Sequence, residues 1–260
     1  MTSARLRRIV FASFVLGAPL AAPSTTSAHA DEGAGPIDGV DGPLPPKPCF
    51  VPPPYNASAN IVGKYDVEGT EPDGKIAPTG TATIKRIVGD LYSMTEVIAG
   101  ATYVAACIRQ NDLFACGWGA ANKDLSVAVY RAEGSVLDGV FYEDRIAALG
   151  RERWTGAAAD LTGALTIAQG ERPEGGSYSG FVQSDFVSAD VYRLTWKIGS
   201  TYRVGYGLRD GERLAVGFNA AGSCGLVAYR IQQGGARLRG RWVDAGRPTA
   251  GVGVETLTRS

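Results

Sequence analysis

Residues 126–131 read SVAVYR, and residues 226–230 read LVAYR. The final arginines of the two stretches, Arg131 and Arg230, lie 99 residues apart. Each stretch is a short apolar run rich in valine and tyrosine, a composition that favours β-strands. Near-identical runs at such a distance indicate that a longer unit is repeated. If so, the segments that surround the two runs should also correspond.

The segments around both stretches correspond at a nearly constant offset of 99 to 101 residues. The clearest pairs are GKYDVEGT (63–70) with GALTIAQG (163–170), LYSMTEVI (91–98) with VYRLTWKI (191–198), and LDGVF (137–141) with LRGRW (238–242). So many matches at one offset predict two homologous units in tandem, residues 59–158 and residues 159–260.

Each unit is a series of runs of about seven to ten residues, separated by Gly, Asn or Asp and joined by tight turns. The sequence therefore predicts an all-β protein with about eight short antiparallel strands in each unit. Such a unit protects its sheet edges either by closing into a small up-and-down barrel or by forming a two-sheet β-sandwich. Meander order and similar strand lengths favour two barrels, and the strands are short enough for side chains to fill them.

The amino-terminal region has the pattern of a secretory signal peptide at residues 1–30. Three arginines precede the apolar segment from Ile9 to Leu20, and a small-residue cleavage motif ends at Ala30. Residues 31–58 are rich in proline and glycine and lack periodicity, which predicts a disordered linker. We therefore expect a periplasmic or secreted protein, and no later apolar run is long enough to predict a membrane span.

Removal of the signal peptide changes the chemistry that the chain can perform. The single histidine of the sequence, His29, lies within it. The mature chain therefore excludes histidine triads, histidine general bases and histidine-containing zinc sites. It would carry 23 basic and 26 acidic residues, a balance that argues against nucleic-acid binding.

Four cysteines remain in an exported chain, which indicates disulfide bonds. Cys107 and Cys116 flank a short hairpin turn, and counting back from the turn places them opposite each other on neighbouring strands. Cys49 and Cys224 would then form the second bond and fasten the linker to the second unit. Free thiols are the alternative, and a metal site is disfavoured because histidine is absent.

The remaining residues offer one candidate binding site and no recognisable catalytic motif. Arg237, Arg239 and Arg241 alternate along one strand and form a candidate anion-binding face, with a solvated outer face as the alternative. No nucleophile elbow, phosphate-binding loop or dinucleotide motif is present. No carboxylate appears at matched positions of the two units, so we predict no catalytic residue, cofactor or metal.

The repeated elements resemble those of a group of secreted bacterial tandem-repeat β proteins. The resemblance covers residues 61–257 and rests on the Pro-Asp-Gly turn, the Val-Ala-Val-Tyr-Arg run and the Gly-Arg-Trp motif. Some members of the group carry a loose fibronectin-binding label. The barrels are also similar in outline to avidin-type and lipocalin-type proteins, without their signature residues, so this likeness is one of fold alone.

These observations predict an exported, non-catalytic binding or interaction module. The alternative is a periplasmic small-molecule carrier of the calycin type, which needs an open cavity in a barrel. A histidine-independent hydrolase is the least favoured function and would need two convergent carboxylates.

Overall fold

The computed structural model describes residues 59–120, 124–219 and 225–260. The predicted signal peptide, the predicted linker, Cys49 and Cys224 all lie outside these residues. The first sequence unit contains β1 (Gly63–Thr70), β2 (Gly80–Val88), β3 (Leu91–Ile98), β4 (Ala101–Gln110), β5 (Leu113–Ala120), β6 (Ser126–Glu133), β7 (Val136–Glu143) and β8 (Gly150–Thr155). The second contains β9 (Gly163–Glu171), β10 (Ser177–Ser188), β11 (Val191–Ile198), β12 (Thr201–Asp210), β13 (Arg213–Asn219), β14 (Gly225–Gln232), β15 (Arg237–Val243) and β16 (Gly253–Arg259).

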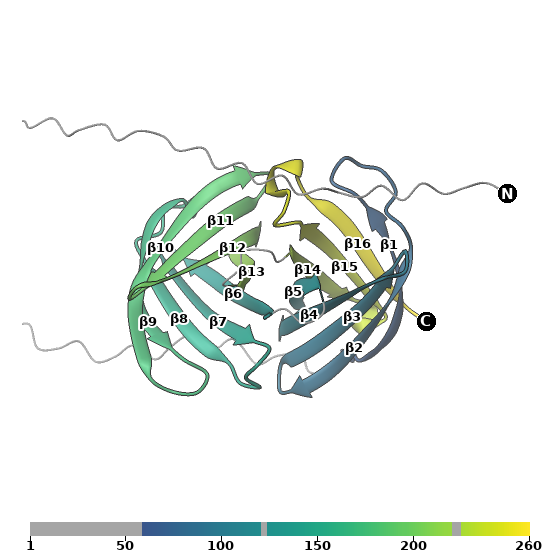
Figure 1. Ribbon diagram of the computed structural model, residues 1–260, viewed down its shortest axis with the longest axis horizontal. Coiled ribbons are helices and arrows are strands. Elements are labelled where there is room, and N and C mark those ends of the chain that lie inside the picture. Colours follow the sequence, from purple (N-terminus) through teal and green to yellow (C-terminus); the bar gives the residue numbers. More distant parts are fainter. Residues whose placement is uncertain (1–58, 121–123, 220–224) are drawn as a thin grey trace, which may run out of the picture. The chain divides into compact units, whose positions relative to one another are not determined.

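These strands form two closed antiparallel barrels of eight strands each, so the predicted all-β barrel fold is confirmed. The first barrel consists of β1–β5 and β14–β16, and the second consists of β6–β13. Both sheets close on themselves, in contrast to the open sheets of the β-sandwich alternative. In Figure 1 the blue and yellow strands, from the two ends of the described chain, share one barrel, and the teal and green strands form the other.

The barrels do not coincide with the sequence repeats. Strand β5 pairs with β14 rather than with β6, and β13 pairs with β6 rather than with β14. Residues 59–158 and residues 159–260 therefore each supply strands to both barrels. Each barrel combines five consecutive strands of one repeat with three of the other, as in a segment-swapped dimer joined into one chain.

Each barrel has its own interior core, filled mainly by inward-facing aromatic and aliphatic side chains. Trp154, Tyr130 and Phe114 are among the largest side chains that are fully buried. This packing follows from the period-two alternation of the strands, which turns every second residue inward.

A third apolar cluster lies where the outer faces of the two barrels meet. It includes Ile108, Leu113 and Leu226 of the first barrel, and Val127 and Leu208 of the second. Strand β6 is buried on both faces for this reason, and its first five residues are all buried. Both barrels accordingly belong to one compact unit of the chain.

Glycine permits a close approach between strands of different barrels. A Cβ atom on Gly117 of β5 would lie 2.2 Å from the carbonyl oxygen of Ser126 in β6 and 3.6 Å from the Cα of Gly217 in β13. A Cβ on Gly217 would lie 2.7 Å from the carbonyl oxygen of Gly225 in β14. Gly117 and Gly217 occupy equivalent positions of the two repeats. A glycine therefore permits close strand packing both where β5 meets β6 and where β13 meets β14.

Candidate functional site

Each barrel contains a row of a tyrosine, a glycine and a glutamate on three adjacent strands, which we call the Tyr–Gly–Glu row. In the second barrel Tyr130 pairs with Gly139, and Gly139 pairs with Glu152. In the first barrel the same register joins Tyr229, Gly240 and Glu255. The two rows are the repeated polar feature of the barrel interiors.

The central glycine of the row allows the tyrosine to reach the glutamate two strands away. A Cβ on Gly139 would lie 2.2 Å from Cδ1 of Tyr130, and a Cβ on Gly240 would lie 2.5 Å from Cδ1 of Tyr229. The ring therefore lies across the glycine, and its hydroxyl arrives at the carboxyl group beyond. Adjacent strands are about 4.8 Å apart, so a tyrosine can span this distance only over a residue without a side chain.

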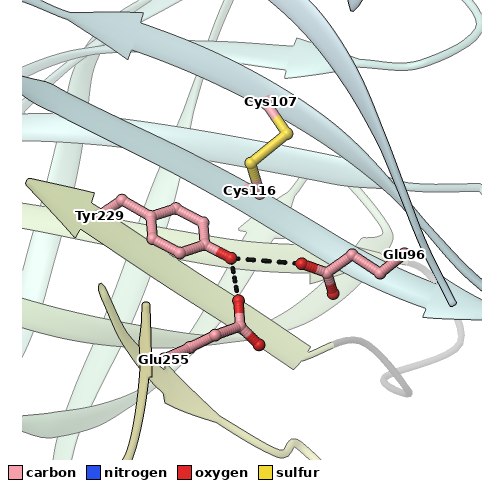
Figure 2. Close-up of a disulfide and its surroundings, with 5 residues drawn as sticks. All are labelled: Glu96, Cys107, Cys116, Tyr229 and Glu255. Carbon is pink, nitrogen blue, oxygen red and sulfur yellow. Dashed lines mark hydrogen bonds between the residues drawn. A yellow bond between two sulfur atoms is a disulfide. The ribbon is translucent and has the colours of Figure 1, made fainter. Parts of the chain in front are cut away.

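In the first barrel a second glutamate joins the row. The Tyr229 hydroxyl lies 3.3 Å from Oε1 of Glu96 and also donates a hydrogen bond to Oε1 of Glu255. Figure 2 shows this hydroxyl between the two carboxyl groups, with the Cys107–Cys116 disulfide nearby. The Glu96 residue is only 7% exposed, so this is a carboxyl pair inside a barrel.

Burial and mutual repulsion decide how this pair is protonated. Burial first, and then the Glu255 charge, raise the pKa of Glu96 well above its ordinary value. Burial also raises the pKa of Glu255, while hydrogen bonds from Tyr229 and Glu96 lower it. Both pKa values are raised, so the pair retains a proton to higher pH than two solvent-exposed carboxyl groups would.

In the second barrel tryptophan and tyrosine donors surround the single glutamate of the row. The Oε2 atom of Glu152 accepts hydrogen bonds from the Tyr130 hydroxyl (2.7 Å) and from Nε1 of Trp154 (2.8 Å) and Trp196 (3.3 Å). Its Oε1 atom accepts a hydrogen bond from the Tyr178 hydroxyl at 2.6 Å. An indole nitrogen can only donate, so this set suits an ionised carboxylate, which can only accept.

The two tyrosines around Glu152 remain protonated donors. Burial, and next the Glu152 charge, raise the pKa of both Tyr130 and Tyr178 above the ordinary tyrosine value. The carboxylate is 6% exposed and has its charge stabilised by these neutral donors.

A cavity of about 170 Å³ opens beside this carboxylate at one end of the second barrel. Its wall runs from buried Tyr130 and Trp196 to Arg172 and Glu174, which are exposed at the β9–β10 turn. Phe141, Tyr178 and Phe218 complete an aromatic lining. The cavity therefore extends from the buried Glu152 carboxylate to the surface, and aromatic side chains line it.

The rim of the cavity carries charges of both signs. Arg203 forms an ion pair with Glu143, and its guanidinium carbon lies 5.9 Å from the ring centre of Phe218. The guanidinium carbon of Arg172 lies 5.5 Å from the ring centre of Tyr178. Three glutamates and two arginines line the cavity, so it has an excess of one negative charge.

The structure confirms one predicted cysteine pair. Cys107 and Cys116 face each other on β4 and β5 and form a disulfide with a Cα–Cα distance of 4.1 Å. The bond lies in the interior core of the first barrel. The predicted partners Cys49 and Cys224 lie outside the described residues.

The predicted arginine face lies on the outside of β15, away from the cavity. Arg241 pairs with Asp190 at 3.0 Å and donates a hydrogen bond to the carbonyl oxygen of Arg209 at 2.5 Å. Arg239 is exposed and pairs in register with Arg230 of β14, while Arg237 is half-buried. Arg241 is thus engaged by two partners within the chain, and anion binding on this face stays a prediction.

Sequence comparison of the repeats missed the matched glutamates Glu152 and Glu255. They lie 103 residues apart, outside the offset of the other matched segments. The difference arises because residues 244–252, which include the 3-10 turn η2 (Pro248–Ala250), form a longer connection than residues 144–149. Gly150 and Gly253, the first residues of β8 and β16, have the same separation as the two glutamates. Aligning these glycines would have revealed that Glu152 and Glu255 are equivalent.

No family model, curated protein or solved structure matches this chain. Within the described residues, no helix has the length and apolar character needed to cross a membrane. The same residues contain no group of three or more histidine, cysteine, aspartate or glutamate side chains that could hold a metal ion.

Proposed function

We propose that this chain is an exported, non-catalytic binding protein whose second barrel holds a small molecule. The observation that supports this function is the cavity of about 170 Å³ at the end of the second barrel. Export follows from the signal peptide predicted for residues 1–30 and agrees with the resemblance to secreted tandem-repeat proteins. A small-molecule carrier is thereby favoured over a module that binds only through its outer faces.

The size of the cavity limits the ligand. Pockets for drug-sized molecules typically have volumes of about 300–1,000 Å³, whereas a cavity of about 150 Å³ accommodates benzene. The cavity of the second barrel therefore suits a ligand of about one ring. Its aromatic walls supply apolar contact, and the charged rim and buried carboxylate supply orientation.

The hydrogen bonding of Glu152 supports binding rather than catalysis. General acid–base catalysis needs a group that can give and take a proton at the reacting atom. The carboxylate of Glu152 accepts from four neutral donors that stabilise its charged form. A group held as an anion in this way is suited to recognising a ligand.

Native mass spectrometry of the protein purified from its own exported fraction tests this function. We expect an additional mass, of the size of a single-ring compound, that is lost on denaturation. A bare chain in the native spectrum would contradict the carrier function and favour a macromolecular partner.

Exposed aromatic residues on the outer face of the second barrel support a second candidate, a protein-interaction module. Phe181 of β10 and Tyr202 of β12 flank Lys197 in one cross-strand row, and both are more than half exposed. Replacing both with serine would abolish a partner interaction through this face and leave small-molecule binding unchanged. Affinity for a partner isolated with the wild-type protein is the corresponding measurement.

A further inference from the structure

We propose that the cavity of the second barrel selects an organic cation, a primary ammonium group carried on a single ring. This inference rests on the proposed small-molecule function and adds the chemical class of the ligand. It is carried by the placement of Glu152 behind an aromatic lining.

The carboxylate has an acceptor site left for a ligand. Among the described residues, Oε2 of Glu152 accepts three hydrogen bonds, whereas Oε1 accepts one, from Tyr178. A carboxylate offers about four lone-pair sites, two on each oxygen. A ligand ammonium group in the cavity can therefore donate a hydrogen bond to Oε1.

The walls of the cavity favour a cation over an anion. Trp196 lines the cavity beside Glu152, and an aromatic ring attracts a cation through its face, whereas Tyr178 and Phe218 already lie beneath the guanidinium groups of Arg172 and Arg203. The positive charge of Arg203 is already matched by Glu143 at the rim. A carboxylate ligand in the inner part of the cavity would meet Glu152 and be repelled, whereas an ammonium group would be attracted.

The first barrel lacks this arrangement, although it is built from the same repeats. The position of Trp196 is taken by Glu96, and the position of Glu152 by Glu255, and both carboxyl groups lie at the Tyr229 hydroxyl. The first barrel therefore has a carboxyl group where the second has the aromatic side chain of Trp196. Glu255 is therefore the matched control for Glu152.

Calorimetric titration of the exported protein at pH 7 with three single-ring probes tests the proposal. The probes are benzylammonium, benzyl alcohol and benzoate, which share a ring and differ in charge. We expect benzylammonium to bind at least tenfold more tightly than the other two. The variant Glu152→Gln should weaken benzylammonium binding at least tenfold, and Glu255→Gln should change it less than twofold.

The possible results separate this proposal from the broader function. Equal or tighter binding of benzyl alcohol or benzoate would overturn the cation preference and leave a small-molecule site in place. Binding of none of the probes would overturn both. An unchanged affinity in Glu152→Gln, or an equal loss in Glu255→Gln, would overturn the assignment to Glu152.

A second measurement on the wild-type protein covers the case in which Glu152→Gln does not fold. In an NMR titration with benzylammonium, the indole N–H signal of Trp196 should shift. The signals of Trp118 and Trp242, which pack against the core of the first barrel, should stay in place. Shifts confined to Trp118 or Trp242 would overturn the proposed location.

Discussion

A single exchange of residue type gives the two barrel interiors different chemistry. At equivalent positions of β3 and β11 the chain has Glu96 and Trp196, and each contacts the glutamate of its Tyr–Gly–Glu row. An indole donor stabilises a charged carboxylate, whereas a second carboxyl group forces the pair to share a proton. The second barrel therefore holds one carboxylate among neutral donors beside its cavity, whereas the first holds two carboxyl groups whose pKa values are both raised.

The raised pKa of Glu96 predicts that stability falls as the pH rises. Burial and then the Glu255 charge make the folded protein hold this proton more tightly than the unfolded chain does. The stabilisation is complete below the ordinary glutamate range and is lost as the pH rises through the folded pKa. Each such group adds a slope of at most about 1.4 kcal/mol per pH unit.

Replacing the Glu96 carboxyl group with an amide, which does not titrate, should remove this dependence of stability on pH. We expect Glu96→Gln to exceed the wild type in unfolding free energy by at least about 1 kcal/mol at pH 8, and to show a flatter profile from pH 5 to pH 9. Urea unfolding at each pH provides the measurement, and the exposed residue Glu68 supplies the control variant Glu68→Gln. An unchanged slope in Glu96→Gln would show that the pair does not share a proton.

At the residue scale, the sequence predicted the disulfide but missed the glutamates. The spacing of Cys107 and Cys116 about a short turn was enough, because antiparallel register fixes which residues face each other. The interior glutamates depend on side chains that meet across several strands, and the longer connection before β16 hid their equivalence. Their location could not be predicted from local sequence.

At the element scale, strands at the junction of the barrels depart from simple alternation. Residues 126–130 are all buried, because one face of β6 lines a barrel interior and the other joins the cluster between barrels. The uninterrupted apolar run SVAVY was a sequence signal of this double burial. Strand β2, in contrast, keeps alternating burial over its first five residues.

The glycine at the strand junction should tolerate no side chain. We expect Gly117→Ala to lower the unfolding free energy by about 1–3 kcal/mol, because its methyl group would overlap a backbone carbonyl of β6. Gly119→Ala, two residues away on the same strand, is the control, because its nearest neighbour is the Leu125 Cδ2 atom at 3.1 Å. Equal stabilities of the two variants would show that β5 and β6 do not approach closely.

The disulfide should stabilise the β4–β5 hairpin of the first barrel. Its cysteines are nine residues apart, and closing a loop of this length contributes about 2–3 kcal/mol in the chain-entropy model. We expect the double variant Cys107→Ala, Cys116→Ala to lose about this much in urea unfolding. A stability equal to that of the wild type would contradict a stabilising role for the bond.

At the scale of the whole molecule, the exchange of strands creates the site. Glu152, Trp154 and Tyr130 come from the first repeat, whereas Trp196 and Tyr178 come from the second. The repeat pattern predicted the number of strands and barrels. It could not predict their exchange, because β5 and β13 have similar sequences and either can pair with β6.

The central claim is that each barrel, and with it the Glu152 site, is built from both repeats. The most direct test is a nuclear Overhauser measurement between the indole groups of Trp154 and Trp196, whose ring centres lie 5.8 Å apart. The structure predicts a cross-peak between the two indoles, assigned by replacing each tryptophan in turn with phenylalanine. Barrels built from single repeats would instead place Trp154 beside Glu96 of β3, the counterpart of Trp196, so contacts from Trp154 to the Glu96 methylene groups and none to Trp196 would contradict the account.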